Sequence, residues 1–165
     1  MVPVFLYSLD PLGPRTNLPG HLDVVLRLIR GGADLELSNR QGFTPLLCAC
    51  HQGHGDIVSV LLAAGVNAAH CDDGGRSAVY VAADAGAGAI VDLLLAWGAE
   101  VDVADAVGLS PLGAACRKGF SGVVRSLLGA GASVTGGPHS TPMFEAANAG
   151  CLEVRPRDGS GGCGS

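Results

Sequence analysis

The chain has 165 residues, of which 48% are apolar and only 4% aromatic, so we expect one domain with a core of Ala, Leu and Val. Ten basic and fifteen acidic residues give a net charge of −5, which argues against a nucleic-acid partner because phosphate recognition needs a basic surface. No apolar run approaches the ~20 residues of a membrane-spanning helix, so no membrane partner is expected.

Residues 1–19 contain four prolines and no helical pattern, which predicts an irregular N-terminal segment. The apolar stretch at residues 2–9 lacks a preceding positive charge, and this argues against a cleaved signal peptide. The sequence also has no Asn-x-Ser/Thr acceptor for glycans. We therefore expect a cytoplasmic or nuclear protein that is not secreted.

From residue 20 onward, several landmarks recur with a period close to 33 residues. The triplet Thr44-Pro45-Leu46 returns as Ser77-Ala78-Val79, as Ser110-Pro111-Leu112 and as Thr141-Pro142-Met143. The same step separates Gly53, Gly86 and Gly119, and it separates the leucine pairs that begin at Leu61, Leu94 and Leu127. A period shared by independent landmarks predicts a chain of stacked structural units.

Each unit is predicted to hold two short helices and a hairpin-like loop. Thr44 suits the N-cap of the first helix, and Pro45 suits its first position, where the missing N–H costs nothing. Gly53 is expected to end that helix, because glycine readily adopts the left-handed conformation. The second helix carries apolar pairs one turn apart, Ile57-Val58 and Leu61-Leu62, so it should pack against neighbours on both sides.

With these motifs, residues 20–154 resemble the ankyrin-repeat family. The resemblance rests on Gly42-Phe43-Thr44-Pro45-Leu46, Gly53-His54, Ile57-Val58, Leu61-Leu62 and Gly65. It implies an all-α fold, an ankyrin-repeat solenoid of stacked helix–turn–helix units with hairpin-like loops. We divide the chain into a half unit at 20–37, full units at 38–71, 72–104 and 105–136, a partial unit at 137–154 and a disordered tail at 155–165.

The sequence departs from the family pattern in the loops and at the ends. A histidine that helps to tie adjacent loops usually follows the Thr-Pro-Leu triplet, but Leu47, Tyr80, Gly113 and Phe144 stand there. We therefore expect that hydrogen-bond network to be absent and apolar packing to contribute more. An Asn common late in the loop is replaced by Ala69, Asp102 and Thr135. Neither end has an evident polar capping unit, so the chain is expected to be marginally stable or prone to associate.

No motif predicts catalysis or a cofactor: the sequence has no phosphate-binding loop, no Gly-x-Ser-x-Gly elbow and no His-Glu-x-x-His. Cys48, Cys50, His51 and His54 are the only cluster with metal-ligand residue types. Cys50 occupies a position that is small in the other units, so a buried core thiol is the preferred interpretation and no metal is expected. Cys71, Cys151 and Cys163 show no paired spacing, which favours reduced thiols.

A solenoid offers an extended surface, so we expect a protein–protein interaction module or scaffold that binds another protein through its concave face and loop tips. The resemblance implies contacts at Arg40, Gln41, Phe43, His51, Gln52, Asp73, Arg76, Asp84, Val107, Leu109, Arg117 and Lys118. Phe43 and Leu109 are expected to face solvent as apolar anchors. Two alternatives stay open: a truncated substrate-recognition adaptor of a ubiquitin ligase, or a non-functional fragment of a longer repeat protein.

Overall fold

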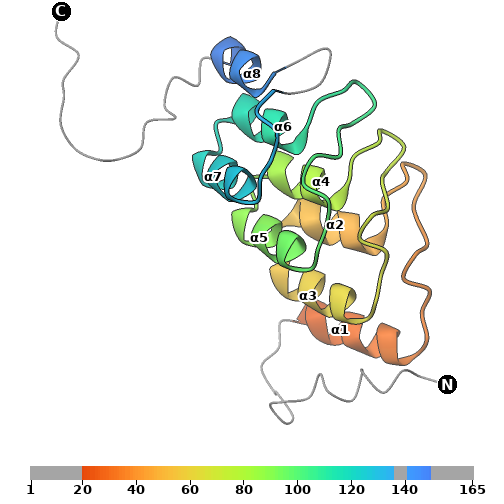
Figure 1. The fold of residues 1–165 in the computed structure, drawn as a ribbon. Coiled ribbons are helices and arrows are strands. Elements are labelled where there is room, and N and C mark those ends of the chain that lie inside the picture. The colour runs from red at the N-terminus through yellow and green to blue at the C-terminus, as the bar shows by residue number, and fades with distance from the viewer. Residues whose placement is uncertain (1–19, 136–140, 150–165) are drawn as a thin grey trace, which may run out of the picture.

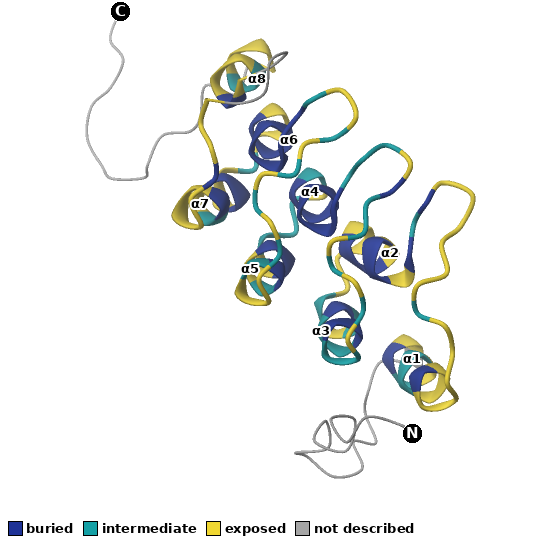
Figure 2. Ribbon diagram, turned by 45° about the vertical axis from the view of Figure 1, so that its right-hand side comes forward, coloured by how far each residue is buried: buried dark blue, intermediate teal, exposed yellow. Residues whose placement is uncertain are grey.

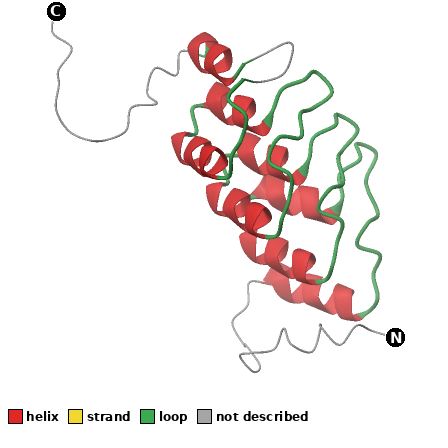
Figure 3. Ribbon diagram, in the orientation of Figure 1, coloured by secondary structure: helices red, strands yellow, loops and turns green. Residues whose placement is uncertain are grey.

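The computed structural model describes residues 20–135 and 141–149, and within these ranges it contains α-helices and no strand (Figure 3). The predicted N-terminal segment at 1–19 and tail at 155–165 lie outside the described residues. The helices are α1 (Gly20–Arg30), α2 (Pro45–Gln52), α3 (Gly55–Ala63), α4 (Ala78–Asp84), α5 (Gly88–Ala96), α6 (Pro111–Lys118), α7 (Ser121–Gly129) and α8 (Pro142–Asn148).

The helices stack in two rows, and the long loops project to one side of them (Figure 1). One row holds the first helices of the units, α2, α4, α6 and α8, and the other holds the second helices, α1, α3, α5 and α7. Among the described residues, the unit of α1 therefore has no first helix, and the unit of α8 has no second helix. The expected solenoid of helix pairs is the observed architecture.

The first helices begin at hydroxyl N-caps. The hydroxyl oxygen of Thr44 accepts a hydrogen bond from the N–H of Leu47 at 3.4 Å, and Pro45 takes the first position of α2. Ser77, Ser110 and Thr141 cap α4, α6 and α8 in the same way. Gly53 ends α2 with a φ of 78°. The predicted starts of these helices and the glycine ends of α2 and α6 are confirmed, while α4 ends at Ala85 and Gly86 follows it with a positive φ.

The core lies between the two rows of helices (Figure 2). The triplet residues Leu46, Val79 and Leu112 enter it from the first helices. Val58, Leu61, Val91, Leu94, Val124 and Leu127 enter it from the second helices. Cys50 is fully buried in the same cluster, as the sequence predicts. Small residues on the first helices let the rows approach closely, so each unit completes the core of its neighbours.

Hydrogen bonds join adjacent loops although the histidine that usually follows the Thr-Pro-Leu triplet is replaced in every unit. The N–H of Asp73 donates to the carbonyl oxygen of Gln41 at 3.2 Å, and that of Ala106 donates to Gly74 at 2.8 Å. These two bonds repeat with the 33-residue period, so the backbone itself supplies the connection. These bonds join backbone groups, which every residue carries whatever its side chain. The absence of the histidines therefore could not show whether the bonds form.

Candidate functional site

A groove with a volume of about 590 Å³ lies between two neighbouring loops and the first helices that follow them, α2 and α4. We call it the loop–helix groove. It is lined by Asn39, Arg40, Gln41, Phe43, Cys48, His51, Gln52, Asp73, Gly74, Arg76, Tyr80, Val81 and Asp84. Its walls come from segments about one repeat apart, so stacking of the units creates it.

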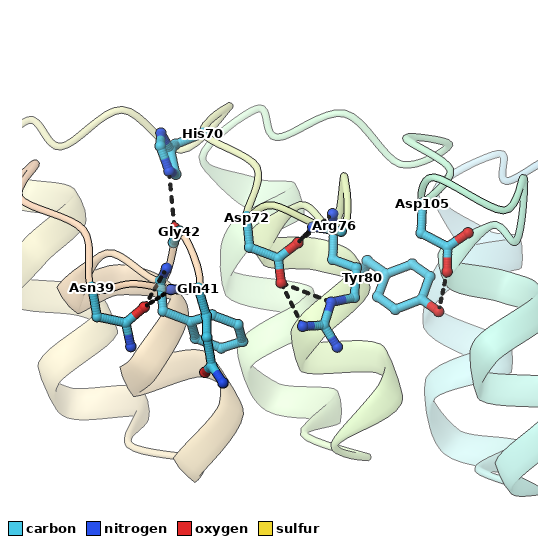
Figure 4. Close-up of polar contacts among 10 residues, drawn as sticks. Asn39, Gln41, Gly42, His70, Asp72, Arg76, Tyr80 and Asp105 are labelled. Carbon is cyan, nitrogen blue, oxygen red and sulfur yellow. Dashed lines mark hydrogen bonds and ion pairs between the residues drawn. The ribbon is translucent and has the colours of Figure 1, made fainter.

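Short polar side chains hold the loops of this groove in shape (Figure 4). The side-chain oxygen of Asn39 accepts hydrogen bonds from the N–H groups of Gln41 and Phe43, at 2.9 and 3.0 Å. Asp72 and Asp105 make the same two bonds in the next loops, to the N–H groups two and four residues on. This turn was not predicted from the sequence, although the 33-residue spacing of Asn39, Asp72 and Asp105 signals it.

Asp72 also binds the side chain of Arg76. One oxygen of its fully buried carboxylate lies 2.7 Å from the Nε of Arg76 and 2.6 Å from a terminal guanidinium nitrogen. Burial would raise the pKa of Asp72, but hydrogen bonds and charge from Arg76, with the N–H of Gly74, hold that pKa below its usual value. Asp72 therefore stays a carboxylate and orients Arg76 at the groove.

Arg76 in turn contacts Phe43, which forms an aromatic pair with His51. Its guanidinium carbon lies 5.5 Å from the ring centroid of Phe43, within the range of a cation–π interaction. The ring of His51 meets that of Phe43 edge to face, with centroids 6.2 Å apart and planes at 80°. Phe43 is half-buried, and His51 is exposed. The contacts thus form one chain from Asp72 through Arg76 and Phe43 to His51 across the groove wall.

At the other side of the groove, Asp84 lies near two cations of the next unit. Its carboxylate oxygens are 3.5 Å from Arg117 and 3.7 Å from Lys118. All three side chains are partly exposed, so the ion pairs contribute little to stability. They extend the charged border of the groove toward α6.

The structure brings together most of the contact residues predicted from the sequence. Eight of the twelve line the loop–helix groove: Arg40, Gln41, Phe43, His51, Gln52, Asp73, Arg76 and Asp84. Arg117 and Lys118 border it through Asp84, and Val107 is exposed in the next loop. Whether these residues contact a partner stays a prediction.

Leu109 does not face solvent, and this expectation is corrected. Its side chain is only 4% exposed and clusters with Tyr80 and Ala114. The physical reason is Gly113, one helical turn further on: a Cβ there would lie 2.6 Å from a methyl group of Leu109. Because Gly113 has no side chain, Leu109 folds inward over it and is not an anchor for a partner.

Tyr80 is a groove residue that the sequence analysis did not place there. Its hydroxyl donates a hydrogen bond to Asp105 in the next unit at 2.9 Å (Figure 4). Burial, followed by the bond to Asp105, raises the pKa of Tyr80 above its usual value, so the phenol stays protonated as a donor. Tyr80 follows the triplet Ser77-Ala78-Val79, where the family usually has a histidine, and its hydroxyl supplies a bond between units at that place.

The cysteine–histidine cluster contains one deeply buried thiol. Burial raises the pKa of Cys50 to about 12, so this thiol is a poor metal ligand and a poor nucleophile at neutral pH. In residues 20–135 and 141–149, no group of three His, Cys, Asp or Glu side chains is placed to hold a metal ion. The longest described helix, α1, has 11 residues, and no helix in these ranges could cross a membrane.

Comparison with known proteins agrees with this architecture. The family model for ankyrin repeats (3 copies) matches residues 17–105, about half of the chain. No curated protein matches the chain. The helix pairs, the capped first helices and the stacked loops extend the repeat pattern beyond the matched range, to α6 and α7. The chain therefore belongs to the ankyrin-repeat family, whose members generally act as non-enzymatic protein–protein interaction modules.

Proposed function

We propose that this chain binds another protein through the loop–helix groove. The observation that supports this most directly is the gathering of eight predicted contact positions in one groove of about 590 Å³. The groove is wide and open along the loops, which suits a segment of a partner protein better than an enclosed small molecule. The general role of the family in protein–protein interaction supports the same conclusion.

The groove offers both apolar and charged contacts to such a segment. The aromatic pair of Phe43 and His51 lies beside the guanidinium of Arg76, while Asp73 and Asp84 add negative charge. Aromatic and arginine side chains are the residue types that most often carry the binding energy at protein interfaces. We therefore propose Phe43 and Arg76 as central contacts and the exposed polar residues around them as the rim.

The test replaces exposed groove residues and leaves the residues that hold the loops unchanged. The groove variant carries Arg76→Gln at a central contact whose side chain is 41% exposed, together with His51→Ala and Gln52→Ala at exposed positions. The matched control carries Asp92→Ala and Arg125→Ala, two exposed positions on α5 and α7 outside the groove. Circular dichroism should give the same helicity for both variants and the original chain.

Each chain is immobilised and used to capture proteins from cell extracts, and the captured proteins are quantified by mass spectrometry. We expect a set of proteins that binds the original chain and the control equally and is reduced at least tenfold with the groove variant, a loss of ~1.4 kcal/mol. Equal capture by the groove variant would overturn the assignment of the binding surface. Loss with the α5 and α7 control alone would move the surface to the row of second helices.

A further inference from the structure

Apolar side chains are exposed mainly at the two ends of the described array. Nine large apolar side chains are exposed among the described residues. Six of them lie on α1, on α7, in the turn after α7 or on α8: Val24, Leu28, Leu128, Val134, Met143 and Phe144. Monomeric soluble proteins rarely expose apolar side chains in contiguous groups, so both ends need an explanation.

At the N-terminal end, an apolar groove of about 330 Å³ lies between α1 and α2, and we call it the end groove. Leu28 and Ile29 line it from α1, and Pro45 and Ala49 line it from α2. Leu28-Ile29 lies 33 residues before Leu61-Leu62 of α3, so α1 takes the place of a second helix. The end groove is therefore the place where a first helix would pack in a complete unit.

At the other end, α8 is a first helix with an uncovered face. Met143 occupies the triplet position of Leu46, yet it is 77% exposed whereas Leu46 is 2% exposed. Phe144 occupies the position of Leu47, yet it is 60% exposed whereas Leu47 is 1% exposed. Inside the array these positions are covered by the second helix of the same unit and by the following unit. No described residue covers α8 in this way.

We propose that two copies of this chain stack head to tail, with α8 of one copy in the end groove of the next. The groove lacks a first helix, and α8 is a first helix, so the contact would complete one unit from two chains. Met143 and Phe144 would then be covered as Leu46 and Leu47 are inside the array. The α1 helix of the next copy would also continue the row of second helices after α7, where Leu128 and Val134 are exposed.

The contact is heterologous, because the two copies use different surfaces. Each dimer still exposes one end groove and one α8, so further copies can add at both ends. A second copy fits better than an unrelated partner because both complementary surfaces belong to the same chain and follow the same repeat geometry. Each such contact would cover one end groove and one α8, while the outermost two surfaces of the stack stay uncovered.

The test blocks each surface separately. Leu28→Glu places a charge in the end groove, and Phe144→Glu places one on α8; both residues are exposed, and Glu is nearly as good a helix former as Leu. Sedimentation equilibrium should show the mass of the original chain rising above the 16.5 kDa of one copy as concentration increases. Each variant alone should stay at the mass of one copy.

An equal mixture of the two variants is the decisive measurement. The Leu28→Glu chain keeps its α8, and the Phe144→Glu chain keeps its end groove, so the mixture should form dimers and nothing larger. Unfolded variants could not produce this rescue. Met143→Glu, at the most exposed position of α8, serves as a second α8 variant and should behave like Phe144→Glu.

Trp97→Glu is the matched control, because Trp97 is an exposed apolar residue in the middle of the array. Ala64 and Ala130 stand at the same place in the neighbouring units, so the large side chain is not required there. This variant should associate like the original chain. The proposal is overturned if the original chain stays monomeric over the whole concentration range. Association of either single variant, or a mixture without dimers, would also overturn it.

Discussion

Gly86 shows how closely neighbouring units approach one another. It follows α4 with a φ of +75°, and a Cβ there would lie 2.9 Å from the ring of Phe120 in the next unit. Gly53 follows α2 with a φ of +78°, but a Cβ there would meet no other atom within 4 Å. The two glycines therefore share the same backbone conformation and differ in the contact that a side chain would make.

We expect Gly53→Ala to lower the free energy of unfolding by about 1 kcal/mol, the cost of a left-handed conformation in a residue with a Cβ. Gly86→Ala should cost about 1–3 kcal/mol more, because the new methyl group overlaps the ring of Phe120. Urea denaturation monitored by circular dichroism measures both values. Adding Phe120→Leu to Gly86→Ala should recover part of the loss, and equal losses at the two glycines would contradict the contact argument.

Because the carboxylate of Asp72 is buried and paired, we expect the free energy of unfolding to depend on pH. Its pKa is lowered in the folded chain, so its contribution is complete above the ordinary carboxyl pKa of about 4 and is lost as pH falls through the lower folded value. Asp72→Asn should lower the free energy of unfolding at pH 7 by about 1.5–3 kcal/mol, since it removes a charged partner of Arg76.

Urea denaturation at a series of pH values between neutrality and acid checks this prediction. The loss of stability on acidification should be smaller in Asp72→Asn than in the original chain. Asp73→Asn is the matched control, because Asp73 is the exposed neighbour of Asp72. A control that loses as much stability at pH 7 as Asp72→Asn would refute the role of the buried carboxylate.

Among the structural elements, the loops of different units are also joined by side-chain acceptors late in the loops. Glu36 accepts a hydrogen bond from the N–H of Asn67 at 2.7 Å, and Asp102 accepts one from the N–H of Ser133 at 3.1 Å. Both bonds span 31 residues, and Glu36 and Asp102 lie 66 residues apart, which is two periods. Ala69 occupies the equivalent place between them and has no acceptor in its side chain.

Ala69→Asn should therefore bring an acceptor to the N–H of Glu100, which lies 31 residues further on. We expect a gain of about 0.5–1.5 kcal/mol in the free energy of unfolding, the usual net value of a hydrogen bond. Asn is preferred to Asp because Asp72 and Glu100 already place negative charge nearby. Asp102→Ala is the converse variant and should lose a similar amount. A destabilised Ala69→Asn would contradict the equivalence of the three positions.

The helices could be predicted from the sequence because their signals are local. Thr44 and Pro45 favour the start of a helix through their own side chains, and Gly53 favours its end. The residues that meet at the loop–helix groove could be predicted from the repeat, because residues one period apart lie side by side in the stacked units. The burial of Leu109 could not be predicted from exposed loop positions alone, because it depends on the space that Gly113 leaves.

In the whole molecule, each unit is stabilised by its neighbours rather than by a single closed core. The central helices α4 and α5 have units on both sides, and residues 78–83 of α4 are all buried. Within residues 20–135 and 141–149, helix α1 has a neighbouring unit on one side only, and α8 packs mainly against α6. Local stability in a repeat array therefore depends on position, with the ends opening at a lower free energy than the centre.

Amide hydrogen exchange of the original chain in dilute solution should reveal this gradient. We expect the slowest exchange in α4 and α5, intermediate exchange in α3 and α6, and the fastest in α1 and α8, because opening an end disrupts one interface and opening the centre disrupts two. The Gly86→Ala variant provides the internal control: it should speed exchange most in α4 and the neighbouring unit that contains Phe120. Uniform exchange along the array would instead mean that all units open together, and the nearest-neighbour description would then fail.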